Sequence, residues 1–177
     1  MQTIILGGGC FWCTESVFRH VKGVTKVTSG YMGGDAATAN YRAVCGGDTG
    51  HIEVIAVEFD DTIIGLETVL DIFFATHDPT TQDRQGNDVG RQYASVIFYT
   101  DEAAQKPTID RVIGQLHDEM GIRVVTEVHP AQDFHIAEDY HQDYYAKNPT
   151  QSYCNFVIPP KLAKLKQYFS GFVIERD

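Results

Sequence analysis

Two cysteines, Cys10 and Cys13, follow three glycines near the start of the chain and are the residues best placed to do chemistry. The apolar residues before Gly7-Gly8-Gly9 predict a strand and the glycines a tight turn, after which the sequence predicts a helix ending near Gly23. A cysteine in the first turn of a helix lies among unpaired N–H groups at the positive end of the helix dipole. Because this environment favours the thiolate, we predict that Cys10 is a reactive nucleophile rather than a structural cysteine.

A carboxyl group, Glu53, interrupts an otherwise apolar strand between Ile52 and Val54. If it is buried there, its pKa is raised and it can hold a proton near neutral pH, as a general acid must. The strand pattern alone slightly favours the alternative, a carboxylate that points outward from a half-exposed strand.

Four sequence blocks in a fixed order are more specific than any single residue. They are Gly9-Cys10-Phe11-Trp12-Cys13-Thr14-Glu15, Gly46-Gly47-Asp48-Thr49-Gly50-His51-Ile52-Glu53, Gln85-Gly86-Asn87-Asp88-Val89-Gly90-Arg91-Gln92-Tyr93, and Ala137-Glu138-Asp139-Tyr140-His141-Gln142-Asp143-Tyr144 with Asn148-Pro149 and Tyr153-Cys154. In all four the chain resembles the A-type peptide methionine sulfoxide reductases. The resemblance implies reduction of methionine S-sulfoxide, free and in proteins, and hence repair of oxidised proteins.

The resemblance also assigns roles to residues of this sequence. Cys10 would attack the sulfoxide sulfur and become a sulfenic acid, while Glu53 would act as the general acid. Tyr41 and Tyr93 match the family's two tyrosines that hydrogen-bond the sulfoxide oxygen, and Asp88 matches an organiser of that network. For each of these three residues an ordinary core or turn position is the alternative.

Two aromatic residues, Phe11 and Trp12, flank the nucleophile. Aromatic rings pack well against thioether groups, so we expect both to form an apolar wall for the S-methyl group of the substrate. The alternative is that both are plain core residues at a helix start. The residues Thr38-Ala39-Asn40 before Tyr41 differ from the Asn-Pro-Thr more usual in the family.

Cys154 matches the family's resolving cysteine, which attacks the sulfenic acid and forms a disulfide that thioredoxin reduces. It lies in a segment from about residue 148 that has little regular pattern apart from residues 161–169, and we expect the part that carries the thiol to be mobile. Cys13 stands where the family commonly has glycine, one helical turn from Cys10, and is the alternative resolving thiol. No cysteine follows Cys154, so we expect no further relay through the tail.

Alternating strands and helices must position these residues. We expect strands over residues 2–6, 24–31, 52–59, 94–99 and 122–128, and helices over 10–21, 65–76, 102–120 and 136–147. We expect long loops over 33–48 and 77–92, the first with a turn of helix around 41–44. This order indicates an α/β (α+β) fold with a mixed sheet. The resemblance implies a two-layer sandwich with a ferredoxin-like core, in a single catalytic domain over residues 1–177.

Composition limits the function further. The 177 residues carry a formal net charge of −10, so nucleic acid or an anionic membrane is not the expected partner. We see no secretion signal or membrane-length apolar segment, so we expect a cytoplasmic protein whose cysteines are kept reduced. The resemblance implies thioredoxin as the reductant and implies no metal or organic cofactor. We also expect a monomer.

Three other functions compete with this interpretation. Cys10 and Cys13 also suit a thiol–disulfide oxidoreductase, although the bulky Phe11-Trp12 pair between them would impede docking to a protein disulfide. A zinc or redox-sensing module lacks a second Cys/His pair at zinc spacing. A nucleotide site at the glycines lacks the residues of a P-loop or a dinucleotide fold.

Overall fold

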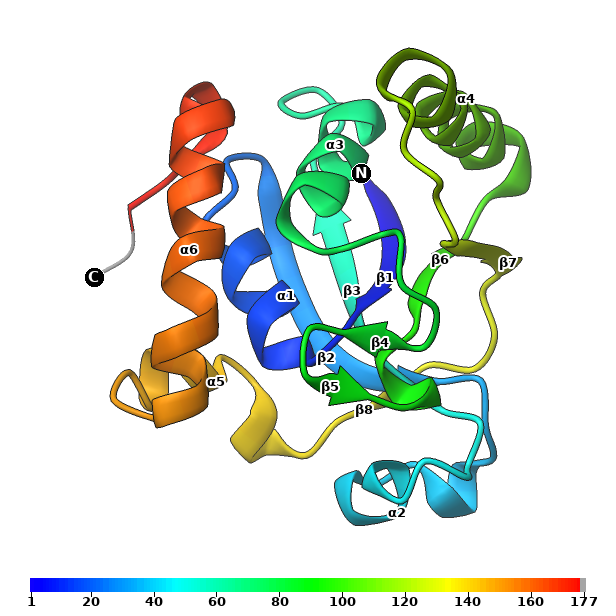
Figure 1. Cartoon of the computed structure of the whole chain (residues 1–177), viewed down its shortest axis with the longest axis vertical. Coiled ribbons are helices and arrows are strands. Elements are labelled where there is room, and N and C mark those ends of the chain that lie inside the picture. The colour runs from blue at the N-terminus through cyan, green and yellow to red at the C-terminus, as the bar shows by residue number, and fades with distance from the viewer. Residues whose placement is uncertain (176–177) are drawn as a thin grey trace.

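The computed structural model describes residues 1–175, and its centre is a βαββαβ unit (Figure 1). The unit consists of β1 (Gln2–Gly8), α1 (Phe11–Arg19), β2 (Val24–Met32), β3 (Ile52–Phe59), α3 (Leu66–Thr76) and β6 (Ser95–Tyr99). Its strands form an antiparallel sheet in the order β6-β1-β3-β2, which is the ferredoxin-like arrangement. The expected fold class is therefore confirmed.

Two short strands extend this sheet at its edges. β7 (Glu127–Pro130) pairs parallel with β6, and β8 (His135–Ile136) pairs antiparallel with β2. The result is a six-stranded mixed sheet in the order β7-β6-β1-β3-β2-β8. A separate hairpin, β4 (Arg84–Gln85) with β5 (Asp88–Val89), and a 3-10 turn over Arg91–Tyr93 organise the long loop after α3.

The two faces of the sheet are buried against different partners. Because side chains alternate along a strand, Ile55, Val57 and Phe59 of β3 face the helices and join the main core. α4 (Glu102–Met120) and α6 (Ser152–Tyr168) contribute Ile109 and Leu165 to the same core. The opposite face carries a smaller apolar cluster that is packed against Phe134.

The start of α1 lies between α6 and the β4–β5 hairpin (Figure 1). α6 runs alongside α1 at one edge of the molecule, and the β4–β5 hairpin lies near the end of β1. The short helices α2 (Tyr41–Cys45) and α5 (Tyr144–Lys147) complete the surroundings, with 3-10 turns over Ala36–Thr38, Asp139–His141 and Ser170–Phe172. Among residues 1–175, no helix is long and apolar enough to cross a membrane.

Three expected elements differ from the structure. The strand expected over residues 122–128 begins only at Glu127. The helix expected over 136–147 is broken into a 3-10 turn and α5, because Asp143 takes a left-handed conformation with φ of 54°. The segment from residue 148 is not pattern-poor in space, since α6 occupies Ser152–Tyr168 even though it contains Pro159 and Pro160.

Candidate active site

The turn between β1 and α1 presents Cys10 at the helix start. Gly9 has φ of 89°, a conformation that favours glycine, and a Cβ there would lie 2.8 Å from the side chain of Gln85. Cys10 is the N-cap of α1, with extended backbone angles, and its carbonyl accepts a hydrogen bond from the backbone N–H of Cys13 at 3.1 Å. Cys10 is half-buried and Cys13 is buried, and both are free thiols.

Glu53 lies beneath this turn, on the helix-facing side of β3. Its side chain is 1% exposed, and Oε1 accepts a hydrogen bond from the backbone N–H of Phe11 at 3.1 Å. Burial raises the pKa of Glu53 to about 8, against the opposing effect of the Phe11 N–H, and the charges of Asp88 and Cys13 raise it further. The carboxyl group is therefore mostly protonated at neutral pH, and the outward-facing alternative is wrong.

The environment of Cys10 differs from the one that its helix position predicts. Burial raises its pKa well above the ordinary thiol value, and the hydrogen bond with Cys13 and the charge of Glu53 act in the same direction. The hydrogen bond from the Trp12 backbone lowers the pKa, as expected at a helix start, but it is the smallest of these effects. The expectation that the helix start favours the Cys10 thiolate is not met in the resting protein, because the local helix effect is outweighed by burial.

Cys13 and Cys154 lie together between α1 and α6. They form one apolar cluster with Ile158, and Cys10 and Trp12 pack against it. The hydrogen bond from Cys10 lowers the pKa of Cys13, whereas burial and the nearby Cys13 charge raise the pKa of Cys154 to about 12. Cys154 is fully buried on a helix, so this thiol does not lie in the irregular segment that the sequence predicts.

Tyr153 connects the thiols with the β4–β5 hairpin. Its hydroxyl lies 4.0 Å from Sγ of Cys13 and donates a short hydrogen bond to the carboxylate of Asp88 on β5. Asp88 is therefore held on the same side of the site as Cys13 rather than in a solvated turn.

Trp12 is held by two residues from the segment before α6. Its Nε1 donates to Nδ1 of His141 at 2.9 Å, and its ring stacks on Tyr144 with centroids 3.9 Å apart. Phe11, by contrast, is 0% exposed and packs against Tyr31 and His141. Trp12 is only half-buried, so of the two expected wall residues it is the one with an accessible surface.

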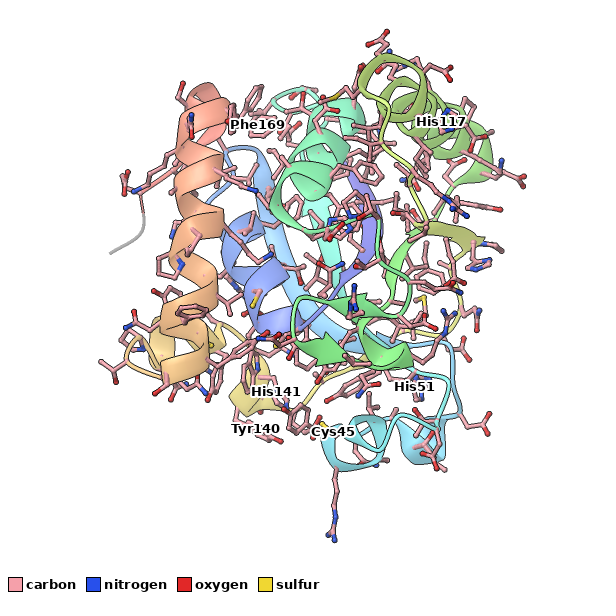
Figure 2. The ribbon with its side chains drawn as sticks, in the orientation of Figure 1. Cys45, His51, His117, Tyr140, His141 and Phe169 are labelled. Carbon is pink, nitrogen blue, oxygen red and sulfur yellow. The ribbon has the colours of Figure 1, made fainter. Side chains whose placement is uncertain are left out.

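The two tyrosines expected to bind oxygen lie near the carboxyl group of Glu53. Burial raises the pKa of both Tyr41 and Tyr93, and the charges of Glu53 and Cys10 contribute to both shifts. Both phenols therefore remain hydrogen-bond donors. Tyr41 also hydrogen-bonds the exposed Cys45, which Figure 2 shows near Tyr140 and His141 at one end of the molecule.

A cavity of about 360 Å³ opens beside the two N-terminal cysteines. Cys10, Cys13 and Asp88 line it, together with a row of α6 side chains that comprises Tyr153, Phe156, Val157 and Lys161. No group of three or more His, Cys, Asp or Glu side chains within residues 1–175 is arranged to hold a metal ion.

Comparisons with known proteins agree with this arrangement. The family model described as peptide methionine sulfoxide reductase matches residues 2–171. The chain belongs to this family. A relative from Psychrobacter sp. (strain PRwf-1), named peptide methionine sulfoxide reductase MsrA, is 72% identical over 98% of this chain and 99% of its own length. An equally named relative from Acinetobacter baumannii (strain AYE) is 54% identical over 96% of both chains.

Solved structures give the same result for the fold. Reduced Mxr1 from Saccharomyces cerevisiae is 34% identical, with a TM-score of 0.78 over 85% of this chain and 87% of that chain. Methionine sulfoxide reductase A of Corynebacterium diphtheriae is 33% identical, with a TM-score of 0.73 over 85% of this chain and 76% of that chain.

Sequence reasoning missed several residues that build this site in a peptide methionine sulfoxide reductase. Glu138 accepts hydrogen bonds from the hydroxyl of Tyr31 at 2.9 Å and from the backbone N–H of Tyr41 at 3.1 Å. His141 and Tyr144 hold Trp12, and all three missed residues belong to the fourth sequence block. The fourth block could have indicated that these residues belong to the site. The contacts that each of them makes can be seen only in the fold.

Proposed function

We propose that this chain reduces methionine S-sulfoxide, free and in proteins, as a single catalytic domain with Cys10 as the nucleophile. The observation that carries the proposal is the convergence of two groups at the start of α1. A thiol stands at the N-cap, and a buried protonated carboxyl accepts a hydrogen bond from the very next residue, Phe11. A nucleophile and a proton donor side by side are what reduction of a sulfoxide requires.

The neutral forms of Cys10 and Glu53 also supply the protons that reduction of the sulfoxide requires. The sulfoxide and the Cys10 thiol give methionine and Cys10 sulfenic acid, so one S–O bond breaks, another forms, and no net proton is consumed. Glu53 donates a proton to the oxygen as sulfur is attacked and recovers one from the thiol. A neutral thiol beside a neutral carboxyl is therefore a competent resting state.

The remaining aromatic residues would bind the substrate. The phenols of Tyr41 and Tyr93 donate hydrogen bonds to the sulfoxide oxygen, and Asp88 organises this side of the site through Tyr153. The Trp12 ring supplies the apolar surface for the S-methyl group, with buried Phe11 supporting it from the core.

Two thiols compete for the resolving step, and the structure favours Cys13. Cys13 hydrogen-bonds the Cys10 thiol and has a lowered pKa. Cys154 is fully buried on α6, has a pKa of about 12, and neighbours Cys13. We propose that Cys13 attacks the sulfenic acid and that Cys154, which sequence reasoning preferred, is not the first thiol to react.

The resulting disulfide needs an external reductant, and we propose thioredoxin in the cytoplasm. The relative Mxr1, 34% identical in its reduced form, has also been solved in complex with Trx2. Neither a metal nor an organic cofactor enters the proposed reaction, and we propose that the chain acts as a monomer.

A single experiment tests the function. The reduced chain is mixed with the S or the R epimer of methionine sulfoxide, without reductant, and free methionine is measured, with Cys10→Ser as the matched control. We expect at least one methionine per chain from the S epimer and none from the R epimer or the control. A chain that reduces insulin disulfides but neither sulfoxide would instead be the thiol–disulfide oxidoreductase.

A further inference from the structure

The cavity beside Cys10 and Cys13, here called the thiol cavity, also contains a cationic side chain, Lys161, that takes no part in the reaction proposed above. It shares the lining of the 360 Å³ cavity with Cys10 and Cys13. Tyr153, Val157 and Lys161 are spaced by four residues on α6, so they form one stripe of the helix. The stripe carries a phenol at one end and an ammonium group at the other.

The ammonium group of Lys161 is fixed rather than free in solvent. Its Nζ donates a hydrogen bond at 2.5 Å to the carbonyl of Thr76, the last residue of α3. A cation is favourable at the C-terminal end of a helix, which explains this anchoring. Lys161 is half-buried, and burial lowers its pKa although the charge of Cys13 acts against this.

Resting on the reductase function proposed above, we propose that Lys161 is a positioning residue for the resolving step, in which its ammonium group stabilises the thiolate of Cys13. The hydrogen bond from Cys10 has the largest effect on the pKa of Cys13 and lowers it, burial opposes this, and Lys161 and Tyr153 lower it further. After the first step Cys10 is a sulfenic acid and no longer a thiol. The charge of Lys161 is unaffected by this change and still acts on Cys13.

Formation of the Cys10–Cys13 disulfide requires only the two cysteines and solvent. The Cys13 thiolate forms an S–S bond with Cys10 while the S–O bond of the sulfenic acid breaks. Cys13 is oxidised, Cys10 is reduced, and the departing hydroxide takes a proton from solvent to become water.

Other charged and titratable groups surround this pair, and they define the controls. The groups that interact electrostatically with Cys13, with Lys161 or with both are Cys10, Tyr153, Asp88, Glu53, Cys154, Asp78, Lys164 and His77. Lys164 is the matched control, because it lies on α6 and lines a neighbouring cavity of about 520 Å³ but not the thiol cavity.

The test separates the two steps of one turnover. Reduced full-length chain is mixed with excess methionine S-sulfoxide and quenched with acid at increasing times, between pH 6 and 10. Methionine reports the first step, and mass mapping of the Cys10–Cys13 disulfide reports the second. The variants are Lys161→Met, Lys161→Gln, the charge-conserving Lys161→Arg, and the control Lys164→Met.

We expect loss of the Lys161 charge to slow disulfide formation at low pH and to accelerate it at higher pH. Loss of one nearby opposite charge lowers the thiolate population about tenfold where the thiol is mostly protonated. The more basic thiolate is intrinsically about threefold more reactive, so disulfide formation slows about threefold at low pH. At a pH where Cys13 is ionised in every protein but Lys161 still carries its proton, the Met and Gln variants become about threefold faster than wild type. Because burial lowers the pKa of Lys161, this difference disappears once Lys161 itself is deprotonated. Lys161→Arg and Lys164→Met keep the wild-type profile over the pH range in which Lys161 is charged, because both retain a cation in the thiol cavity and Lys164 acts on Lys161 rather than on Cys13.

The outcomes distinguish this inference from the function on which it rests. If wild type forms no methionine, the reductase function fails. If methionine forms but the disulfide step of Lys161→Met and Lys161→Gln keeps the wild-type pH profile, or slows equally at every pH, the role of Lys161 is wrong. A disulfide between Cys10 and Cys154 in place of Cys10–Cys13 would also overturn it.

Discussion

The proton on Glu53 is the feature of the site whose removal has the most predictable result. Glu53→Gln preserves the size of the side chain, and its carbonyl oxygen can still accept the hydrogen bond from Phe11. What it loses is the transferable proton. General acid catalysis contributes roughly 10²- to 10⁴-fold, so the first step should slow by that factor, or about 3–5 kcal/mol in the barrier.

The pH dependence provides a second signature of the same proton. Because the pKa of Glu53 is about 8, methionine formation by wild type should decrease as the pH rises through 8, while the residual rate of Glu53→Gln should not show this decrease. Single-turnover methionine formation between pH 6 and 9.5 measures both effects. A variant within threefold of the wild-type rate would refute the assignment of Glu53 as the acid.

The same pKa predicts how stability changes with pH. The folded-state pKa of about 8 lies above that of an unfolded glutamate, so this carboxyl weakens folding progressively as the pH rises from about 4.5 to 8. Between pH 5 and 8.5 wild type should lose about 4 kcal/mol more unfolding free energy than Glu53→Gln, which has no such proton. Urea unfolding of both proteins at the two pH values measures the difference, and parallel losses would contradict a buried neutral Glu53.

Three further outcomes are expected. Cys10→Ser should form no methionine in a single turnover, since loss of a nucleophile costs orders of magnitude; a rate above a few percent of wild type would exclude Cys10. With thioredoxin present, Cys13→Ser should stall after one methionine per chain while Cys154→Ser continues to cycle, and the reverse pattern would make Cys154 the resolving thiol. Tyr144→Leu removes the 3.9 Å stack on Trp12, so it should shift the fluorescence of this only tryptophan and raise KM a few-fold, since such pairs contribute about 0.5–1.5 kcal/mol.

The parts of the site that sequence could predict are those fixed by neighbours along the chain. The glycine turn, the start of α1 and all of β3 depend on local patterns, and they lie close to where the sequence places them. The orientation of Glu53 is different, because both faces of β3 are buried: Val54 joins one cluster and Ile55 the other. A strand that is apolar on both sides gives no alternation from which to choose a face.

The ionisation of Cys10 could not be predicted for a related reason. Sequence identifies the helix start, and the Trp12 backbone does lower the pKa of the thiol as that position requires. The larger effects come from burial, from the hydrogen bond to Cys13 and from Glu53, which is 43 positions away along the chain. A helix dipole is a property of one segment, whereas burial is a property of the assembled fold.

The burial of Cys154 is the property of the site that is least predictable from the sequence. Pro159 and Pro160 lack backbone N–H groups, so they cannot bond the carbonyls of Asn155 and Phe156, four residues earlier in α6. Judged by its own sequence, the first part of this helix is therefore weak. Its stability comes instead from the cap, where the Gln151 side chain accepts from the Cys154 N–H at 2.7 Å, and from apolar packing of Cys154 against Cys13. The same packing buries the thiol that the family resemblance favours, whereas Cys13 hydrogen-bonds the Cys10 thiol. The choice of resolving thiol therefore follows from the fold and not from the motif.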